Sequence, residues 1–423
     1  MLSHYFITTM RFDFNFYSSL LLIFFVHGIV YAILMFRKGV INETVSDKWL
    51  SLFLLLCILY IAPWMIGFAG WYDNQPYRDI LFYTPLQHLY FLGPVVFFYV
   101  QSLLNPGFVF KKKHWWHLLP GILYAMYSLA MFVTDKLVLK RYYFMADGMD
   151  PDFAGWYQDS GFASMLFYFI LSIRYYNVYR KMIVQVVSYA DVVLFRWVKN
   201  FLMAFLGMLL LKVLFYVVAA IYPKAESYWG TWWYFFTFAI IFYYIAITGY
   251  SNAVLAKVSF TIAHLLTNKP TLQLQYEPQP RLGQSQPFIE DVEYIDISDE
   301  APKSPFNEAF PIEDWKQKIV YLFTTEKFYE DPELSLTDLS KKLQTNPSVL
   351  SKIINQGFGQ NFNDFVNAYR VKAVLQKLQA GEQKTQTLLG IAYDCGFNSK
   401  ATFNRAFKKD TGTSPKDWLA THV

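Results

Sequence analysis

The sequence is poor in charged residues and holds only two cysteines. Asp, Glu, Lys and Arg make up 16% of its 423 residues, whereas about a quarter is usual for soluble globular domains. The low cysteine count excludes a disulfide-stabilised scaffold, and a hydrophobic content of 55% excludes disorder over the whole chain. Ten of the twelve tryptophans precede residue 251. The composition therefore averages an apolar half and a more ordinary half.

The sequence also lacks the short motifs of common enzymes. It has no phosphate-binding Walker loop, no G-x-S-x-G elbow and no H-E-x-x-H metalloprotease motif. We therefore expect no catalytic residues, no cofactor, no metal ion and no enzymatic activity.

Seven apolar runs have the length that a membrane span requires, about 20 residues for a hydrocarbon core of about 30 Å. Trp and Tyr lie at the ends of many runs, as in interfacial belts. The sequence thus predicts a polytopic transmembrane helix bundle with about seven spans, near residues 17–36, 49–68, 81–104, 114–133, 161–180, 200–222 and 229–249.

One span carries a charge in its middle. Lys212 lies in the sixth apolar run, and none of the seven runs contains an Asp or Glu to pair with it. A charge at that depth is costly and usually faces a cavity or a partner. Lys212 is therefore a candidate intramembrane ligand site; snorkelling of its side chain, or a misplaced span boundary, is the alternative explanation.

The distribution of Lys and Arg predicts the orientation. With the N-terminus outside, the inner loops hold eleven of these residues and the outer segments hold six. The positive-inside rule therefore favours an N-terminus outside. The expected location is the bacterial inner (cytoplasmic) membrane, which the chain crosses several times. An odd number of spans places the C-terminal half in the cytoplasm.

The segment after the last span has the composition of a linker. Seven prolines lie between Pro270 and Pro311, and residues 290–300 are acidic. Such a segment buries too little apolar surface to fold alone. We therefore divide the chain into a transmembrane region (1–250), a juxtamembrane segment with a flexible linker (251–312) and a helical domain (313–423).

The helical domain contains an internal repeat. Ser335-Leu336-x-x-Leu339-Ser340 aligns with Thr387-Leu388-x-x-Ile391-Ala392, and Gly359 aligns with Gly412, at offsets of 52 and 53 residues. Each copy reads as helix, turn, helix, and Ser or Thr is suited to cap the first helix. This pattern predicts two helix-turn-helix motifs, whose second helices enter the major groove of DNA.

The predicted second helices are rich in hydrogen-bond donors. Arg and Asn read base edges, and Lys and Ser hold phosphates. Residues 363–378 read as one helix that joins the copies, long enough for them to contact two successive major grooves. The candidate DNA-binding donors are Ser348, Ser351, Lys352, Lys400, Thr402, Asn404, Arg405 and Lys408.

Residues 313–423 resemble the DNA-binding domain of AraC/XylS-family transcriptional regulators. The resemblance rests on Ile391-Ala392, Gly396-Phe397, Phe407-Lys408-Lys409 and Gly412-Thr413-Ser414-Pro415. It implies DNA contacts at the positions that fall here on Ser348, Ser351, Lys352, Lys400, Ala401, Thr402, Asn404 and Arg405. Trp418-Leu419 departs from the usual Tyr-Arg. With its membrane region, the chain resembles membrane-embedded AraC-like regulators of Bacteroidetes.

The sequence therefore predicts a membrane-anchored, sequence-specific transcriptional regulator that couples a membrane or extracytoplasmic signal to gene expression. The expected partners are double-stranded DNA, membrane lipids and an unknown small-molecule or membrane signal, with RNA polymerase and a second copy of the chain as further candidates. A membrane transporter or membrane enzyme with an accessory DNA-binding readout is the alternative, and a helical protein-interaction adaptor is a third interpretation.

Overall fold

A computed structural model describes residues 12–188, 192–251, 260–263, 271–274, 294–296 and 312–422. The chain folds into two compact units. The first unit comprises residues 1–175 and 197–258, and the second comprises residues 176–196 and 259–423. The second unit thus includes the connection between two helices of the apolar half.

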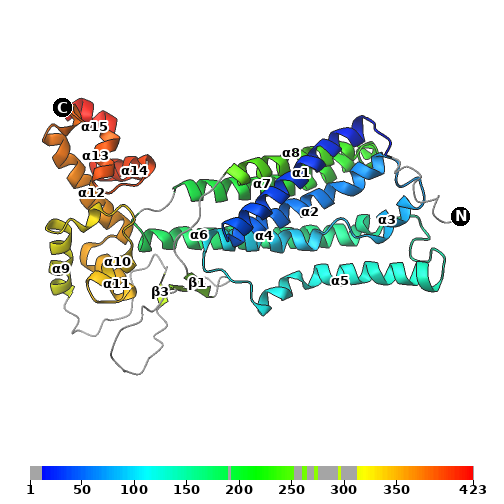
Figure 1. Ribbon diagram of the computed structural model, residues 1–423, viewed down its shortest axis with the longest axis horizontal. Helices are drawn as coiled ribbons and strands as arrows, with labels where there is room; N and C mark the ends of the chain where they lie inside the picture. The colour runs from blue at the N-terminus through cyan, green and yellow to red at the C-terminus, as the bar shows by residue number, and fades with distance from the viewer. Residues whose placement is uncertain are drawn as a thin grey trace, which may run out of the picture. The chain divides into compact units, whose positions relative to one another are not determined.

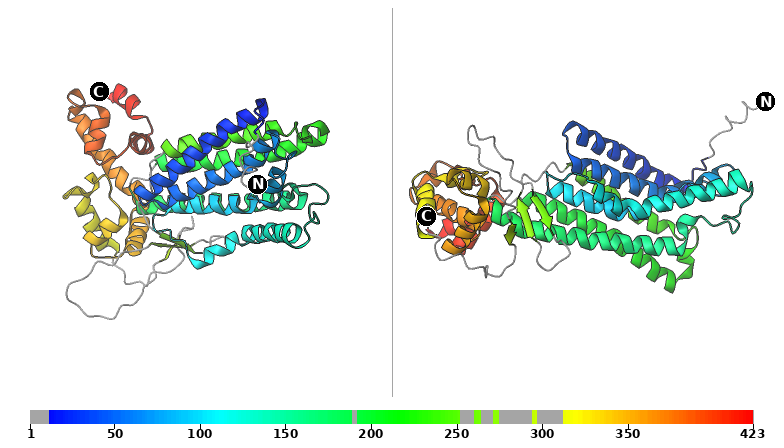
Figure 2. Two further views of the ribbon diagram at one scale, coloured as in Figure 1. Left: turned by 45° about the vertical axis from the view of Figure 1, so that its right-hand side comes forward. Right: turned by 90° about the horizontal axis from the view of Figure 1, so that it is seen from below.

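The first unit is built from long apolar helices. Figures 1 and 2 show α1, α2, α4 and α8 running alongside one another, and α2 contacts the other three. Gly28 permits this packing, because a Cβ there would lie 2.7 Å from Ile58 and 3.0 Å from Phe242. The α-helices are α1 (Phe16–Ile41), α2 (Val45–Phe68), α3 (Tyr77–Tyr83), α4 (Leu89–Leu104), α5 (Trp115–Phe132), α6 (Gly155–Val186), α7 (Val192–Ile221) and α8 (Trp232–Ser251). Short 3-10 helices are η1 (Lys112–His114), η3 (Pro151–Phe153) and η4 (Pro223–Glu226), and η2 (Val133–Val138) is a π-helix.

Five helical segments of the described part are long and apolar enough to cross a membrane. They are Phe16–Ile41, Val45–Phe68, Lys112–Val138, Arg196–Ile221 and Trp232–Ser251. Helix α4 is apolar but has only 16 residues. Helix α6 is the longest, at 32 residues, and is more polar because it carries Arg174, Arg180 and Lys181.

The third expected span is not one helix, which corrects the prediction for residues 81–104. Helix α3 ends at Tyr83, Thr84 is extended, and α4 begins only at Leu89. Pro85 explains the break, because proline has no backbone N–H and disfavours helical geometry in the residue before it. The break leaves the backbone N–H groups of residues 86 and 87 available to side chains.

The segment expected to be an unstructured linker contains three short strands, which also differs from the prediction. They are β1 (Phe260–Ala263), β2 (Thr271–Leu274) and β3 (Tyr294–Asp296), and they form an antiparallel sheet in the order β1-β2-β3. Phe260 pairs with Leu274, and Leu272 pairs with Ile295. Alternating apolar and β-branched residues favour such pairing despite the nearby prolines. Ser251 ends α8 and Ile312 begins α9, and the rest of the predicted linker lies outside the described residues.

The helical part of the second unit has two lobes that share one helix. The first core contains Phe323, Leu339 and Ile353, and the second contains Ile391, Phe403 and Phe407. Helix α12 extends from Phe362 to Gln379, slightly longer than predicted, and contributes to both cores. The first lobe comprises α9 (Ile312–Thr324), η5 (Phe328–Glu330), α10 (Leu336–Lys342) and α11 (Pro347–Phe358), and the second comprises η6 (Glu382–Lys384), α13 (Leu388–Asp394), α14 (Lys400–Thr411) and α15 (Pro415–His422).

Candidate functional site

The two lobes have capping residues at matching positions, which confirms the predicted duplication. Ser335 caps α10 by accepting the N–H of Asp338, and Thr387 caps α13 by accepting the N–H of Gly390. Asn346 and Ser399 cap the second helices α11 and α14 in the same way. Side-chain oxygens at these positions satisfy N–H groups that a helix leaves unpaired. Each lobe is therefore a helix-turn-helix with its own helix boundaries.

The turn inside each motif requires a left-handed backbone. Gln344 has φ +55° in the first turn and Gly396 has φ +89° in the second, again 52 residues apart. A second reason favours glycine at position 396, because a Cβ there would lie 2.3 Å from the backbone oxygen of Tyr329. Only glycine fits that position without moving the first lobe.

Most of the predicted DNA-binding side chains are exposed on the second helix of each motif. Lys352 is exposed on α11, within the first lobe. Helix α14 presents a larger set, which consists of Lys400, Ala401, Asn404, Arg405 and Lys408. These residues have the reach and chemistry that contacts with base edges and phosphates require.

Three predicted residues are placed differently. Ser351 is buried in the first lobe, and Thr402 is buried at the start of α14, where its hydroxyl accepts a hydrogen bond from Ser399 at 2.9 Å. Ser348 is the second residue of α11, and its side chain lies outside the described part of the structure. The part these three residues play in binding DNA stays a prediction.

The second helices of the two lobes differ strongly in charge. Helix α14 carries Lys400, Arg405, Lys408 and Lys409, whereas α11 carries only Lys352. Lys409 forms an ion pair of 2.7 Å with Asp364 of α12, so one of the cations of α14 is already engaged. The positive charge of the two second helices is therefore concentrated on α14.

Arg370, on the shared helix α12, is a functional candidate that the sequence did not reveal. Its side chain is fully buried, and its Nε and Nη2 donate to the backbone oxygens of Tyr329 at 2.8 Å and Asp331 at 2.6 Å. The guanidinium also lies 5.9 Å from the ring of Phe397 in the second lobe. Burial lowers its pKa to about 10, so the group is charged at neutral pH. Arg370 thus joins the two lobes.

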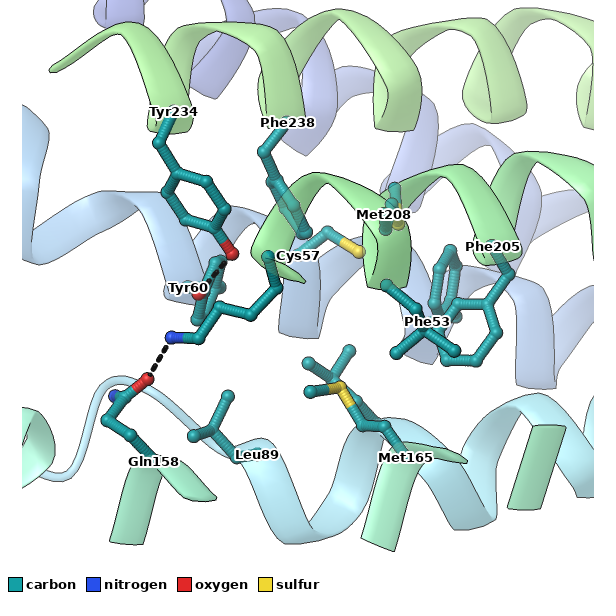
Figure 3. A pocket seen from close by; sticks show the side chains of 13 residues that line it. Phe53, Cys57, Tyr60, Leu89, Gln158, Met165, Phe205, Met208, Tyr234 and Phe238 are labelled. Atoms are coloured by element: carbon teal, nitrogen blue, oxygen red, sulfur yellow. Dashed lines mark hydrogen bonds between the residues drawn. The ribbon is translucent and has the colours of Figure 1, made fainter. Parts of the chain in front are cut away.

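Lys212 is half-buried in α7 and faces a small, mostly apolar cavity. Its Nζ donates to Oε1 of Gln158 at 2.6 Å, and this bond is the dashed line at Gln158 in Figure 3. Tyr60 and Tyr234 share a hydroxyl hydrogen bond of 2.8 Å at the same end, and Phe53 and Phe205 lie at the opposite end (Figure 3). The other lining residues are Cys57, Leu89, Leu92, Met165, Met208, Leu209 and Phe238. The cavity therefore has one polar and one apolar end.

A chain of hydrogen bonds leads from Lys212 to a buried carboxyl group. Gln158 donates through Nε2 to Oε1 of Gln87 at 2.7 Å, and the backbone N–H of Gln87 donates to Oδ2 of Asp152 at 2.8 Å. The N–H of Leu86 donates to the same oxygen at 2.8 Å. These are the N–H groups that the break at Pro85 leaves available.

Asp152 is one of two neighbouring buried acids. Its N–H donates to Oδ1 of Asp150 at 2.9 Å, and the hydroxyls of Tyr124 and Tyr72 donate to Asp152 and Asp150 respectively. Burial raises the pKa of both carboxyl groups, and the charge of Asp152 raises that of Asp150 further. Perturbed acids in a polar cluster are typical of functional sites.

Comparison with known proteins identifies the domain that holds the two motifs. A family model described as a helix-turn-helix domain matches residues 339–421. Uncharacterised HTH-type transcriptional regulators of Staphylococcus aureus strains COL and MSSA476 are each 35% identical over 91 residues. That match covers 22% of this chain and 12% of each relative, so the chain shares only a small part of their length.

One solved structure also matches the chain. A protein of unknown function from Listeria innocua is 28% identical, and the match covers 26% of this chain and 97% of that protein, with a TM-score of 0.23. The relatives that share this segment are named as HTH-type transcriptional regulators. Residues 339–421 therefore match a helix-turn-helix domain, in agreement with the two motifs that the structure contains.

Proposed function

We propose that this chain is a membrane-anchored transcriptional regulator that binds DNA sequence-specifically and couples a membrane or extracytoplasmic signal to gene expression. The observation that carries the proposal is the joining of an AraC-type domain to apolar helices of membrane-spanning length in one chain. DNA is the partner that the domain implies. Membrane lipids, RNA polymerase and a second copy of the chain are further partners that this function would require or use.

Exposed apolar side chains support the membrane anchor. Ile23, Val30 and Ile33 of α1 are each about half exposed, although they are large hydrophobic residues. Leu129 of α5 and Leu210 of α7 are similarly exposed. Such extensive apolar surface is unfavourable in water and is expected where lipid covers a helix.

Contacts at the end of α6 support an orientation with the DNA-binding domain in the cytoplasm. Ser188, two residues after α6, donates its backbone N–H to the oxygen of Leu334 in the first lobe, at 3.1 Å. The end of α6 therefore lies in the compartment that contains the DNA. Positive charge is concentrated at the same end, at Arg180 and Lys181, as the positive-inside rule requires.

Lys212 and the acids Asp150 and Asp152 are the signal-receiving site in this proposal. The hydrogen-bond chain joins a cation inside the bundle to two carboxyl groups in the connection before α6. With the N-terminus outside, that connection faces the extracytoplasmic side. Binding of a small anion, or protonation of the two acids, would change the net charge of this hydrogen-bonded network directly.

The second lobe supplies most of the proposed base reading. Arg405 and Asn404 are exposed on α14, and these residue types pair bidentately with guanine and adenine. Lys352, Lys400 and Lys408 would hold phosphates, and Ala401 would contact the thymine methyl group. Ser348, Ser351 and Thr402 complete the proposed set, the last two through small adjustments of their buried side chains.

The test is operator selection by the intact chain in lipid nanodiscs, followed by affinity measurements. Arg405→Ala should weaken binding to the selected operator by about 1–3 kcal/mol and relax the sequence preference at one position. Lys384→Ala, which removes an exposed cation from η6, is the matched control and should leave binding unchanged. Equal affinity of the wild-type chain for operator and random DNA would refute sequence-specific regulation.

A transporter or membrane enzyme with an accessory DNA-binding readout is the second candidate. The buried polar chain from Asp152 to Lys212 favours it, because ionisable groups inside a bundle often line transport pathways. Proteoliposomes distinguish the two functions. Proton or anion flux that Lys212→Met abolishes would support transport, and its absence together with operator binding would support regulation.

A further inference from the structure

The segment that follows α6 is seated on the DNA-binding domain. Val187 forms an isolated antiparallel bridge with Ser335, the residue that caps α10. Ser188 donates both its N–H and its hydroxyl to the backbone oxygen of Leu334, at 3.1 Å and 2.7 Å. Ser188 is fully buried. Val187–Ser188, which we call the docking segment, therefore pairs with Leu334 and Ser335 just before α10.

Helix α12 holds the docking segment from the other side. Asn363 donates through Nδ2 to the backbone oxygen of Val187 at 3.1 Å, and Asn367 donates to that of Ser188 at 3.2 Å. The two asparagines are four residues apart and thus share one face of the helix. Each is only 4% exposed. Two amide side chains thus recognise two consecutive peptide oxygens.

Arg370 continues the same face and reaches the docking segment too. Its Nη2 donates to the Ser188 hydroxyl at 3.1 Å, and its Nη1 lies 3.5 Å from the Ser188 backbone oxygen. A buried guanidinium has five N–H donors and is costly to leave unsatisfied. Ser188 therefore supplies further oxygen acceptors to the guanidinium of Arg370, the residue that joins the two lobes.

The chemistry of this contact indicates a reversible connection. It consists mainly of hydrogen bonds, which exchange with water at a small net free energy, rather than of large apolar side chains. Asn404 and Arg405 are exposed on α14 and form none of these hydrogen bonds, so a docked domain still presents them.

We propose that Val187–Ser188 is a regulatory docking element. Its position between the start of α10 and α12 sets the distance between α11 and α14, the second helices of the two motifs. Docked, it adds hydrogen bonds between the start of the first lobe and α12, the helix that both lobes share. Withdrawn with α6, it leaves the two lobes less constrained, and binding to two successive grooves loses its preorganisation. This inference rests on the proposed function and names how that function is regulated.

The first test removes the amides that recognise the docking segment. Asn363→Ala with Asn367→Ala should weaken operator binding by the full chain in nanodiscs about tenfold. Alanine favours helix, so α12 itself should persist. Gln376→Ala, an exposed amide on the same helix, is the matched control and should bind as the wild type does. Unchanged or tighter operator binding by the double variant would overturn the proposal.

The second test restores the docking covalently. Val187→Cys with Asn363→Cys should form a disulfide on oxidation, and neither single variant should do so. Oxidised chain should bind operator several-fold more tightly than the same chain after reduction. Unchanged or weaker binding by the cross-linked form would overturn the proposal.

One further outcome separates this inference from the function on which it rests. If wild-type chain shows no preference for any DNA sequence, the proposed function fails and the regulatory inference fails with it. If wild-type chain binds operator while both sets of variants bind equally well, only the docking element is refuted.

Discussion

The two units bury ionisable side chains in opposite ways. The first unit places two carboxyl groups, Asp150 and Asp152, side by side among hydroxyl and N–H donors. The second unit buries one guanidinium, Arg370, among backbone and side-chain oxygens. Carboxyl groups with raised pKa values can change charge near neutral pH, whereas the guanidinium remains charged. The carboxyl pair is therefore suited to change its protonation state in response to a signal. Arg370, whose charge is constant, is suited to stabilise the second unit.

The largest expected effect is on the second unit. Arg370→Leu leaves several buried oxygens without donors and should lower the free energy of unfolding of this unit by about 3 kcal/mol or more. The rate at which a thiol reagent labels buried Cys395 during denaturation reports the loss. Lys372→Leu removes an exposed cation from the same helix and should have little effect. Equal stability of the two variants would show that the buried guanidinium of Arg370 does not stabilise the second unit.

A glycine beside Arg370 should be nearly as sensitive. Gly396→Gln forces a side chain into a left-handed position whose Cβ would lie 2.3 Å from the Tyr329 oxygen. We expect a loss of about 2 kcal/mol or more, again followed by labelling of Cys395. The reciprocal change Gln344→Gly, at the matching position of the first lobe, should be tolerated. Similar losses for both changes would show that the crowding at Gly396 is unimportant.

The acid pair of the first unit should make its stability depend on pH. Because folding raises both carboxyl pKa values, the folded state binds protons that the unfolded state has released. The stabilisation is complete at acidic pH and is lost as pH rises through neutrality. The melting temperature in nanodiscs should therefore fall between pH 5 and pH 9, and Asp150→Asn, which removes the carboxyl group with the larger shift, should remove much of that dependence.

A nearby acid provides the control for this measurement. Asp147 is exposed in the same connection, so Asp147→Asn should leave the pH profile unchanged. A wild-type profile that is flat, or one that rises towards pH 9, would contradict the assignment of Asp150 and Asp152 as buried proton-binding groups.

The smallest effect concerns exposed cations of the second unit. Lys408→Ala should reduce the slope of log affinity against log salt concentration by about 1, because one phosphate contact is lost. Its unfolding free energy should barely change, since exposed charges contribute little to stability. A clear loss of stability without a change in slope would place Lys408 in the fold rather than in the interface.

The sequence predicted the repeated parts of the second unit well. The offsets of 52 and 53 residues align Ser335 with Thr387 and Gly359 with Gly412, and these residues cap helices in the structure. Caps and left-handed turns depend on local residue type, so they are readable without tertiary information. The family resemblance of the domain was accessible for the same reason.

Contacts between distant residues could not be predicted in this way. Arg370 lies on an otherwise ordinary helix and would be taken for a solvated charge, yet it bonds to Ser188, 182 residues earlier. Lys212 was singled out as an isolated charge, but its connection to Asp152 depends on Gln87 and Gln158, which carry no motif. Proline alone did not locate the break at Pro85, because Pro63, Pro94 and Pro120 lie inside helices α2, α4 and α5.

The length of α6 has a mechanical consequence. Its 32 residues form a rod of about 48 Å, well beyond the roughly 30 Å of a hydrocarbon core. In such a lever, a tilt of about 5° around one end moves the other by about 4 Å, more than the length of a hydrogen bond. A slight tilt of α6 would therefore move its end far enough to break the hydrogen bonds of Ser188 with Leu334 and Asn367.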